Sequence, residues 1–207
     1  MIPSILLRSK PEGRIGSLTL NTTRLEAFSD GVIAILITIM VLEFKTPHEA
    51  TLAALRPLLP VFLSYLLSFV ILGIYWNNHH HLMHITERVS GSVLWANLHL
   101  LFWLSMIPFT TAWMSEHHDA PLPVAVYGGV LLCGSIAWLI LKERIVRLDA
   151  NARLREAVGS DLKGKASFAV YVAAVPLAFV WPPLSIGLYV LVALVWLAPD
   201  RRIESKV

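Results

Sequence analysis

The stretch that decides the fold is Arg24-Leu-Glu-Ala-Phe-Ser-Asp-Gly-Val-Ile-Ala-Ile-Leu-Ile-Thr-Ile-Met-Val-Leu-Glu43, a helix pattern whose apolar run opens with the carboxylate of Asp30 inside it. A helix needs about 20 mostly apolar residues to cross the hydrocarbon core of a bilayer. Thr23 and Glu26 have the spacing of a capping box, which predicts that a helix begins here. An ionisable side chain inside such a helix is costly, so Asp30 is a candidate functional residue, either a hydrogen-bonding hub between helices or a group on a permeation path.

The composition of the whole chain indicates the same class of protein. Of its 207 residues, 56% are hydrophobic and only 15% are charged, against about 25% charged in an ordinary soluble domain. The formal net charge of +3 does not point to nucleic acid, because the basic residues fall at expected helix ends and in connections. A single cysteine excludes an intrachain disulfide and a two-cysteine metal site. We therefore predict an all-α integral membrane protein that contacts the lipid bilayer and binds no nucleic acid.

Six apolar segments are candidate transmembrane helices. They are residues 23–43, 58–83, 92–114, 122–142, 166–181 and 184–198. The last two are separated at Trp181-Pro182-Pro183, since neither proline can continue a helix. The predicted organisation is a basic cytoplasmic arm (1–22), a six-helix membrane domain (23–198) with a charged, amphipathic cytoplasmic helix in its 142–165 loop, and a cytoplasmic tail (199–207).

Basic residues predict the orientation. Lys and Arg are concentrated in the arm, in the 142–165 loop and in the tail. These three regions lie on the same side of a six-span chain, and cytoplasmic connections carry the excess of basic residues. We therefore expect both termini to be cytoplasmic.

The second half of the first helix carries a stripe of large aliphatic side chains. Ile35, Ile39 and Leu42 lie at positions i, i+4 and i+7 on one face, with Thr38 beside them. Such a stripe is more often helix packing than a pore. A hydrophobic ring contributed by several subunits can nevertheless gate ions by dewetting, so both interpretations stay open.

A histidine-rich segment, Tyr75-Trp-Asn-Asn-His-His-His-Leu-Met-His-Ile-Thr-Glu-Arg88, ends the second apolar run. His80, His84 and Glu87 fall at i, i+4 and i+7, a spacing that could hold zinc through nitrogen and oxygen ligands. This spacing supports an alternative function, a histidine-based metal transporter or a metal-dependent membrane enzyme. A polar helix end at the membrane interface is the more common explanation, and His81 and His84 could make the protein sensitive to pH.

The motif Arg24-x-x-x-Phe28-Ser29-Asp30, followed by Gly-Val-x-Ala-Ile-x-x-Thr and by Leu42-Glu43, resembles the signature first helix of the transmembrane protein 175 family of potassium channels in its bacterial form. The resemblance covers essentially the whole chain. It implies a single six-helix repeat, a homotetramer in the bacterial plasma (inner) membrane, and potassium ions as the permeating species. No enzymatic activity and no cofactor follow from it, and no nucleotide-binding loop or nucleophile motif occurs in the sequence.

The resemblance also assigns roles to residues of the first helix. It implies that four copies of this helix line the pore, with an apolar constriction at Ile35, Ile39 and Leu42 and a polar pore-lining neighbour at Thr38. No Thr-Val-Gly-Tyr-Gly loop occurs in the sequence, so the expected channel lacks the usual carbonyl selectivity filter. Residues from three helices are expected to form a network that anchors the first helix: Arg24, Phe28, Ser29, Asp30, Trp76, Asn77, His80 and Asn97.

Overall fold

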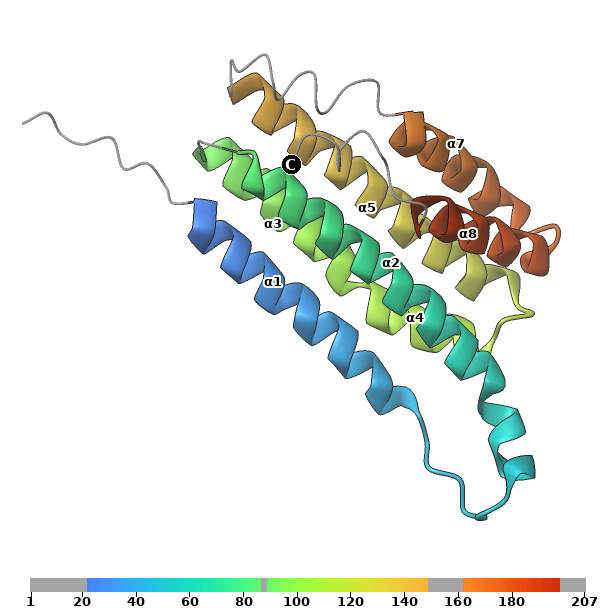
Figure 1. Cartoon of the computed structure of the whole chain (residues 1–207). Helices are drawn as coiled ribbons and strands as arrows, with labels where there is room; N and C mark the ends of the chain where they lie inside the picture. Colours follow the sequence, from blue (N-terminus) through green and yellow to red (C-terminus); the bar gives the residue numbers. More distant parts are fainter. Residues whose placement is uncertain (1–21, 87–88, 149–161, 198–207) are drawn as a thin grey trace, which may run out of the picture.

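The computed structural model describes residues 22–86, 89–148 and 162–197. Its regular elements are helices that lie side by side in one bundle (Figure 1). In chain order they are α1 (Thr22–Ile39), η1 (Met40–Glu43), η2 (Leu52–Leu58), α2 (Leu59–His84), α3 (Gly91–Ser105), α4 (Ile107–Glu116), α5 (Pro121–Leu148), α7 (Leu162–Leu177) and α8 (Pro182–Leu197). The predicted arm, the predicted tail and residues 149–161 of the predicted charged loop lie outside the described residues.

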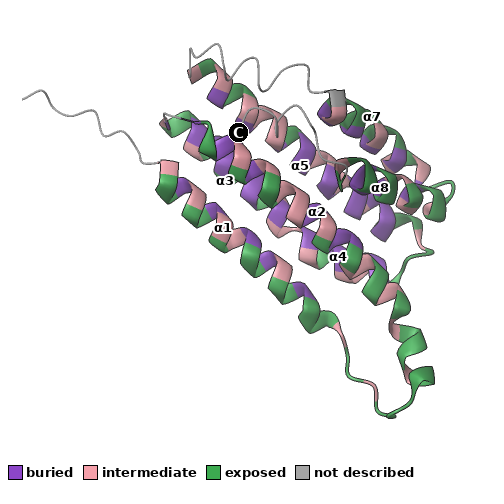
Figure 2. Cartoon of the chain, in the orientation of Figure 1, coloured by how far each residue is buried: buried purple, intermediate pink, exposed green. Residues whose placement is uncertain are grey.

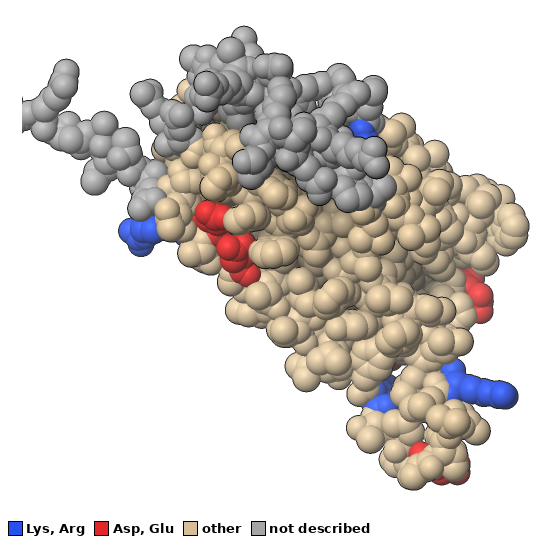
Figure 3. Space-filling view, viewed as in Figure 1, with Lys and Arg blue, Asp and Glu red and all other residues tan. Residues whose placement is uncertain are grey.

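Among the residues that the structure describes, four helical segments are long and apolar enough to cross a membrane: Thr22–Glu43, Leu52–His84, Gly91–Glu116 and Pro121–Leu148. The prediction of an all-helical membrane protein is therefore confirmed. α7 and α8 have 16 residues each, which is about 24 Å of helix against a hydrocarbon core of about 30 Å. The predicted crossings by these two helices thus remain predictions. The face drawn in Figure 3 is largely uncharged, as expected for a surface that contacts lipid.

The third predicted span is interrupted at Met106, between α3 and α4. Pro108 lies in the first turn of α4 and has no N–H to donate to the preceding turn. Threonine hydroxyls bond to the carbonyls at this break: Thr110 donates to the Met106 carbonyl at 3.1 Å and Thr111 to the Ile107 carbonyl at 2.7 Å. Despite the break, Gly91–Glu116 remains one continuous apolar segment.

The predicted turn between the last two helices is confirmed. α7 ends at Leu177 and α8 begins at Pro182. The Trp181 backbone N–H donates to the Leu177 carbonyl at 2.8 Å, closing the turn. The buried Ser185 hydroxyl donates to the Ala174 carbonyl at 2.9 Å and ties the start of α8 to α7.

α5 is longer than the fourth segment predicted from the sequence, residues 122–142. The predicted span ends at residue 142, but α5 runs on to Leu148. Ile145 is fully buried, while Glu143 and Arg147 form an exposed pair at 2.6 Å across one helical turn. Because the apolar face continues beneath the charged one, the helix does not stop where the charges begin. The first part of the predicted 142–165 cytoplasmic helix is therefore the end of α5.

α5 packs against α3, α4, α7 and α8 and forms the middle of the bundle. Tyr189 of α8 lies close to α5 at Gly128, where an added Cβ would lie 2.0 Å from the Tyr189 hydroxyl. That hydroxyl donates to the Val124 carbonyl at 3.2 Å. Figure 2 shows buried positions on the faces turned into the bundle and exposed positions on the outer faces.

We expect Gly128→Ala to lower the thermal unfolding temperature of the detergent-solubilised protein, because the new methyl group forces Tyr189 and α8 away from α5. Overpacking of this kind costs about 1–3 kcal/mol. Gly129→Ala is the matched control, since a Cβ there meets nothing within 4 Å. Equal unfolding temperatures for the two variants would contradict this account of the α5–α8 contact.

Candidate functional site

α1 has one buried and one exposed face. The buried residues recur at intervals of three or four, as expected for one stripe of a helix, and are Leu25, Ser29, Ile33, Leu36 and Met40. This face lies against α2, α3 and α4, and α1 stands at the edge of the bundle (Figures 1 and 2).

The residues predicted to form a pore constriction lie on the exposed face of α1. Ile35 is 59% exposed, Ile39 is 39% exposed, and Leu42, in the following η1 turn, is 78% exposed. Thr38 is also exposed, and its hydroxyl donates to the Ile35 carbonyl at 3.0 Å. The other described helices of the same chain therefore do not cover this stripe.

A buried hydrogen-bonded chain connects α1 to α3 and α2. The Asn97 amide donates from Nδ2 to the Ser29 hydroxyl at 2.9 Å, and that hydroxyl donates to the Leu25 carbonyl at 2.9 Å. Asn97 Oδ1 lies 2.8 Å from Nε2 of His79. An amide oxygen can only accept, so Nε2 carries the proton in this contact. Ser29, His79 and Asn97 are each fully buried.

Asp30 follows Ser29 on α1 but is not one of the three side chains that form this hydrogen-bonded chain. It is half-buried, and its buried oxygen Oδ1 has no hydrogen-bond partner among the described residues. Nδ1 of His79 is likewise buried and unpartnered within the described part of the chain. The carboxylate of Asp30 is close enough to His79 to act on it electrostatically. Each of these two residues therefore keeps one buried polar atom without a partner among the described residues.

The structure separates the residues that the sequence grouped as one network. Ser29 and Asn97 are brought together as expected. Arg24 and Phe28 instead lie on the exposed surface of α1. Trp76 and Asn77 are exposed on α2.

The histidine bonded to Asn97 is His79, whereas the sequence placed His80 in the expected network. His80 is exposed, and its Nδ1 lies 2.8 Å from Oε1 of Glu26 on α1. One residue along a helix turns the side chain by 100°, so only one of three successive histidines faces the bundle. His79 lies seven positions after Leu72 and thus on the same face, but the burial of that face is known only from the structure.

The rings on the outer side of α2 form a stack. The ring of His80 lies 6.2 Å from that of Trp76 and 6.3 Å from that of His84, centroid to centroid, with both pairs nearly parallel. Within the described ranges no group of three or more His, Cys, Asp or Glu side chains could hold a metal ion. Glu87, the third residue of the alternative metal site, lies outside those ranges. The described geometry therefore gives no support to that alternative.

Known proteins resemble this chain over most of its length. A family model described as endosomal/lysosomal potassium channel TMEM175 matches residues 24–108. A potassium channel of Chryseobacterium sp. (strain P1-3) is 53% identical over 184 residues, covering 88% of this chain and 96% of the relative. A potassium channel of Streptomyces collinus is 32% identical over 191 residues, covering 83% and 89%.

A solved structure agrees with these relatives. The crystal structure of a lysosomal potassium-selective channel TMEM175 homolog from Chamaesiphon minutus matches with a TM-score of 0.72 and 30% identity, covering 84% of this chain and 95% of that one. The apolar helices, the relatives and this solved structure thus define a multi-pass helical membrane protein of the channel class, not an enzyme. The chain belongs to the TMEM175 family. Membership in its bacterial branch is confirmed by the bacterial relatives.

We expect Asn97→Ala to destabilise the contact of α1 with α2 and α3. The substitution removes the partner of Ser29 and of His79 at once, and a buried polar group left unpaired costs about 1–3 kcal/mol. The readout is the thermal unfolding temperature in detergent. Asn77→Ala, at an exposed position of α2, is the control and should leave that temperature unchanged; a larger loss for Asn77→Ala would favour the network predicted from the sequence.

Proposed function

We propose that this protein is a potassium-permeable cation channel whose pore is lined by α1 from four copies of the chain. The observation that supports this most directly is the exposed apolar stripe of Ile35, Ile39 and Leu42 on a helix whose other face is buried. The potassium channels to which the chain is similar support the choice of ion. Membership in the family supports one repeat per chain and assembly as a homotetramer.

In this proposal the stripe forms the narrow section of the pore. A ring of aliphatic side chains offers no ligands to an ion, so permeation is controlled by the width and wetting of the ring. Potassium ions release water more readily than sodium ions do, and a narrow apolar ring therefore favours potassium. Thr38 lies on the same face, and because its hydroxyl proton is used by the Ile35 carbonyl, its oxygen remains as an acceptor toward the pore.

The hydrogen-bonded chain of Ser29, Asn97 and His79 holds α1 in register with α2 and α3 in this proposal. A bond between buried polar groups in an apolar surrounding has no competing water, so it specifies one rotation of the helix about its axis. That rotation determines which residues face away from the bundle. Asp30, with one buried oxygen still unpartnered, belongs to the anchor of α1 and not to the ion path.

We also propose that the protein lies in the bacterial inner membrane with both termini in the cytoplasm. Arg24 lies at the start of α1, and Arg144 and Arg147 lie near the end of α5. The connection between α4 and α5, at the opposite end of α5, carries Glu116 and Asp119. This distribution of charge agrees with the preference of basic residues for the cytoplasmic side.

We expect Ile35→Asn and Ile39→Asn to lower the potassium-to-sodium flux ratio in proteoliposomes several-fold, because a polar ring is more easily wetted. Leu194→Asn is the matched control: Leu194 on α8 is 57% exposed, against 59% for Ile35. The control should leave the ratio unchanged. If both pore variants retain the original ratio while passing current, the stripe does not form the constriction; if the protein passes no ion at all, the proposed function itself is wrong.

We expect Asp30→Ala to reduce the amount of tetramer more than the flux through each tetramer that remains. The carboxylate is half-buried beside His79, where it supports the position of α1. Size-exclusion chromatography with light scattering measures assembly, and flux normalised to tetramer measures conduction. Asp30→Asn, which keeps the shape and a hydrogen-bonding group, should restore assembly; a stable tetramer without flux would place Asp30 on the ion path.

A further inference from the structure

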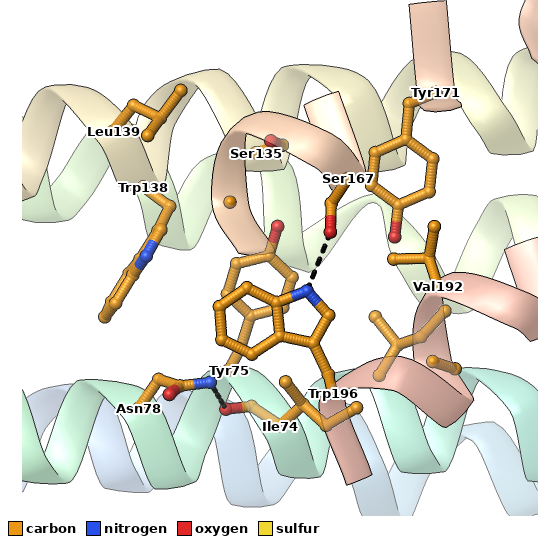
Figure 4. A pocket seen from close by; sticks show the side chains of 13 residues that line it. Ile74, Tyr75, Asn78, Ser135, Trp138, Leu139, Ser167, Tyr171, Val192 and Trp196 are labelled. Atoms are coloured by element: carbon orange, nitrogen blue, oxygen red, sulfur yellow. Dashed lines mark hydrogen bonds between the residues drawn. The ribbon is translucent and has the colours of Figure 1, made fainter. Parts of the chain in front are cut away.

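A second feature of the structure lies on the side of the bundle formed by α5, α7 and α8. It is a pocket with a cavity volume of about 50 Å³ between these helices and α2 (Figure 4). This volume admits a few water molecules or a short piece of hydrocarbon chain, since one water needs about 10–15 Å³ by this measure. Four aromatic side chains line it: Tyr75, Trp138, Tyr171 and Trp196. None of the lining residues belongs to α1, so the pocket is separate from the proposed pore.

The pocket combines apolar walls with polar groups. The Trp196 indole donates to the Ser167 hydroxyl at 2.8 Å, and Figure 4 shows this bond beside the open centre of the pocket. The Ser167 hydroxyl in turn donates to the Lys163 carbonyl at 2.8 Å. Ser135 and Asn78 add further polar atoms to the lining. Aromatic walls with a few polar groups are typical of a site for an amphipathic ligand.

Positive charge is concentrated next to these walls. Nζ of Lys163 lies 6.0 Å from the centre of the Trp196 ring. Lys142 follows the lining residue Trp138 by one helical turn on α5. Lys142 and the exposed Lys165 of α7 are close enough to repel each other electrostatically. An anion placed between two such ammonium groups reduces that repulsion.

The ends of α7 and α8 that flank this pocket carry residues typical of the lipid headgroup region. Both helices have 16 residues, about 24 Å, and a bilayer adjusts to a short hydrophobic stretch by becoming locally thinner. Lys163 lies near the start of α7, and Trp196 lies near the end of α8. Tryptophan and lysine at helix ends are the residues that contact the headgroup region.

We propose that the pocket and its lysines bind an anionic phospholipid of the surrounding membrane. Part of one acyl chain lies against the aromatic walls, and the phosphate group lies among Lys142, Lys163 and Lys165. The cavity accommodates only part of one chain, so the rest of the lipid stays in the bilayer. Aromatic walls alone would accept any lipid; the three lysines select for negative charge, because basic residues near a membrane surface attract anionic headgroups.

Native mass spectrometry of the purified full-length protein tests this with two synthetic lipids that share their acyl chains, phosphatidylglycerol and phosphatidylcholine. We expect phosphatidylglycerol to be retained in preference to phosphatidylcholine. The double variant Lys163→Gln/Lys165→Gln should weaken phosphatidylglycerol binding roughly 10-fold or more, since each basic residue contributes about 1 kcal/mol. Phosphatidylcholine binding should be unaffected.

Two further variants separate a lipid site from general surface charge. Lys45→Gln removes an exposed lysine near Glu116, far from the pocket in sequence and on another connection, and should leave lipid binding unchanged. Ala193→Phe fills the cavity from its α8 wall while keeping every lysine, and should also weaken phosphatidylglycerol retention. Elution at the wild-type volume establishes that each variant is folded. Equal retention of the two lipids by the wild type, or wild-type retention by the double lysine variant, overturns the proposal.

Discussion

The hydrogen bond from Asn97 to Ser29 is the contact on which the position of α1 depends. Both side chains are fully buried, and His79 completes the chain on the far side of Asn97. In apolar surroundings a donor or acceptor that loses its partner finds no water in exchange, so the cost of breaking this chain is much larger than its net contribution to stability suggests. Aliphatic packing alone would tolerate several rotations of α1, because leucine and isoleucine are interchangeable in size. The hydrogen bond from Asn97 to Ser29 permits one rotation of α1, and that rotation turns Ile35 and Leu42 away from the bundle.

The remainder of the bundle supplies the rigid surface against which α1 is fixed. α5 occupies the middle, and its Gly128 lets Tyr189 of α8 approach the backbone closely enough to bond to the Val124 carbonyl. A second buried cluster joins three helices, since the Ser68 hydroxyl of α2 contacts Thr111 of α4 at 2.7 Å and Tyr127 of α5 at 2.9 Å. α1 contacts this body on one side only and stands at its edge (Figure 1). That arrangement suits a helix which is shared with other copies of the chain around a pore.

The two proposed sites use different physical means and lie in different parts of the chain. The proposed constriction on α1 is a row of side chains without any ligand for an ion, and its effect comes from width and wetting. The proposed lipid site at α5, α7 and α8 depends on aromatic walls and on lysine charge. Because the pocket includes Tyr75 and Asn78 of α2, and His79 of the same helix bonds to Asn97, α2 connects the two regions. A lipid bound at one side of α2 therefore lies against the helix that helps to hold α1 on its other side.

The sequence by itself determined the class of protein, the positions of the first four apolar segments, the proline turn at Trp181 and the family, because these depend on local composition, on residues that stop helices and on a contiguous motif. It also placed Ser29 and Asn97 in one expected network, and these two side chains do form a hydrogen bond. The identity of the inward-facing histidine was decided only by the tertiary structure: three successive histidines look alike in a sequence, and the rotation of α2 against its neighbours selects His79. The end of α5 was missed for a related reason, since the buried Ile145 continues the helix beneath charged residues that resemble a loop. The pocket proposed as a lipid site is assembled from α2, α5 and the α7–α8 hairpin, which are far apart in the chain, and such a juxtaposition leaves no local pattern to read.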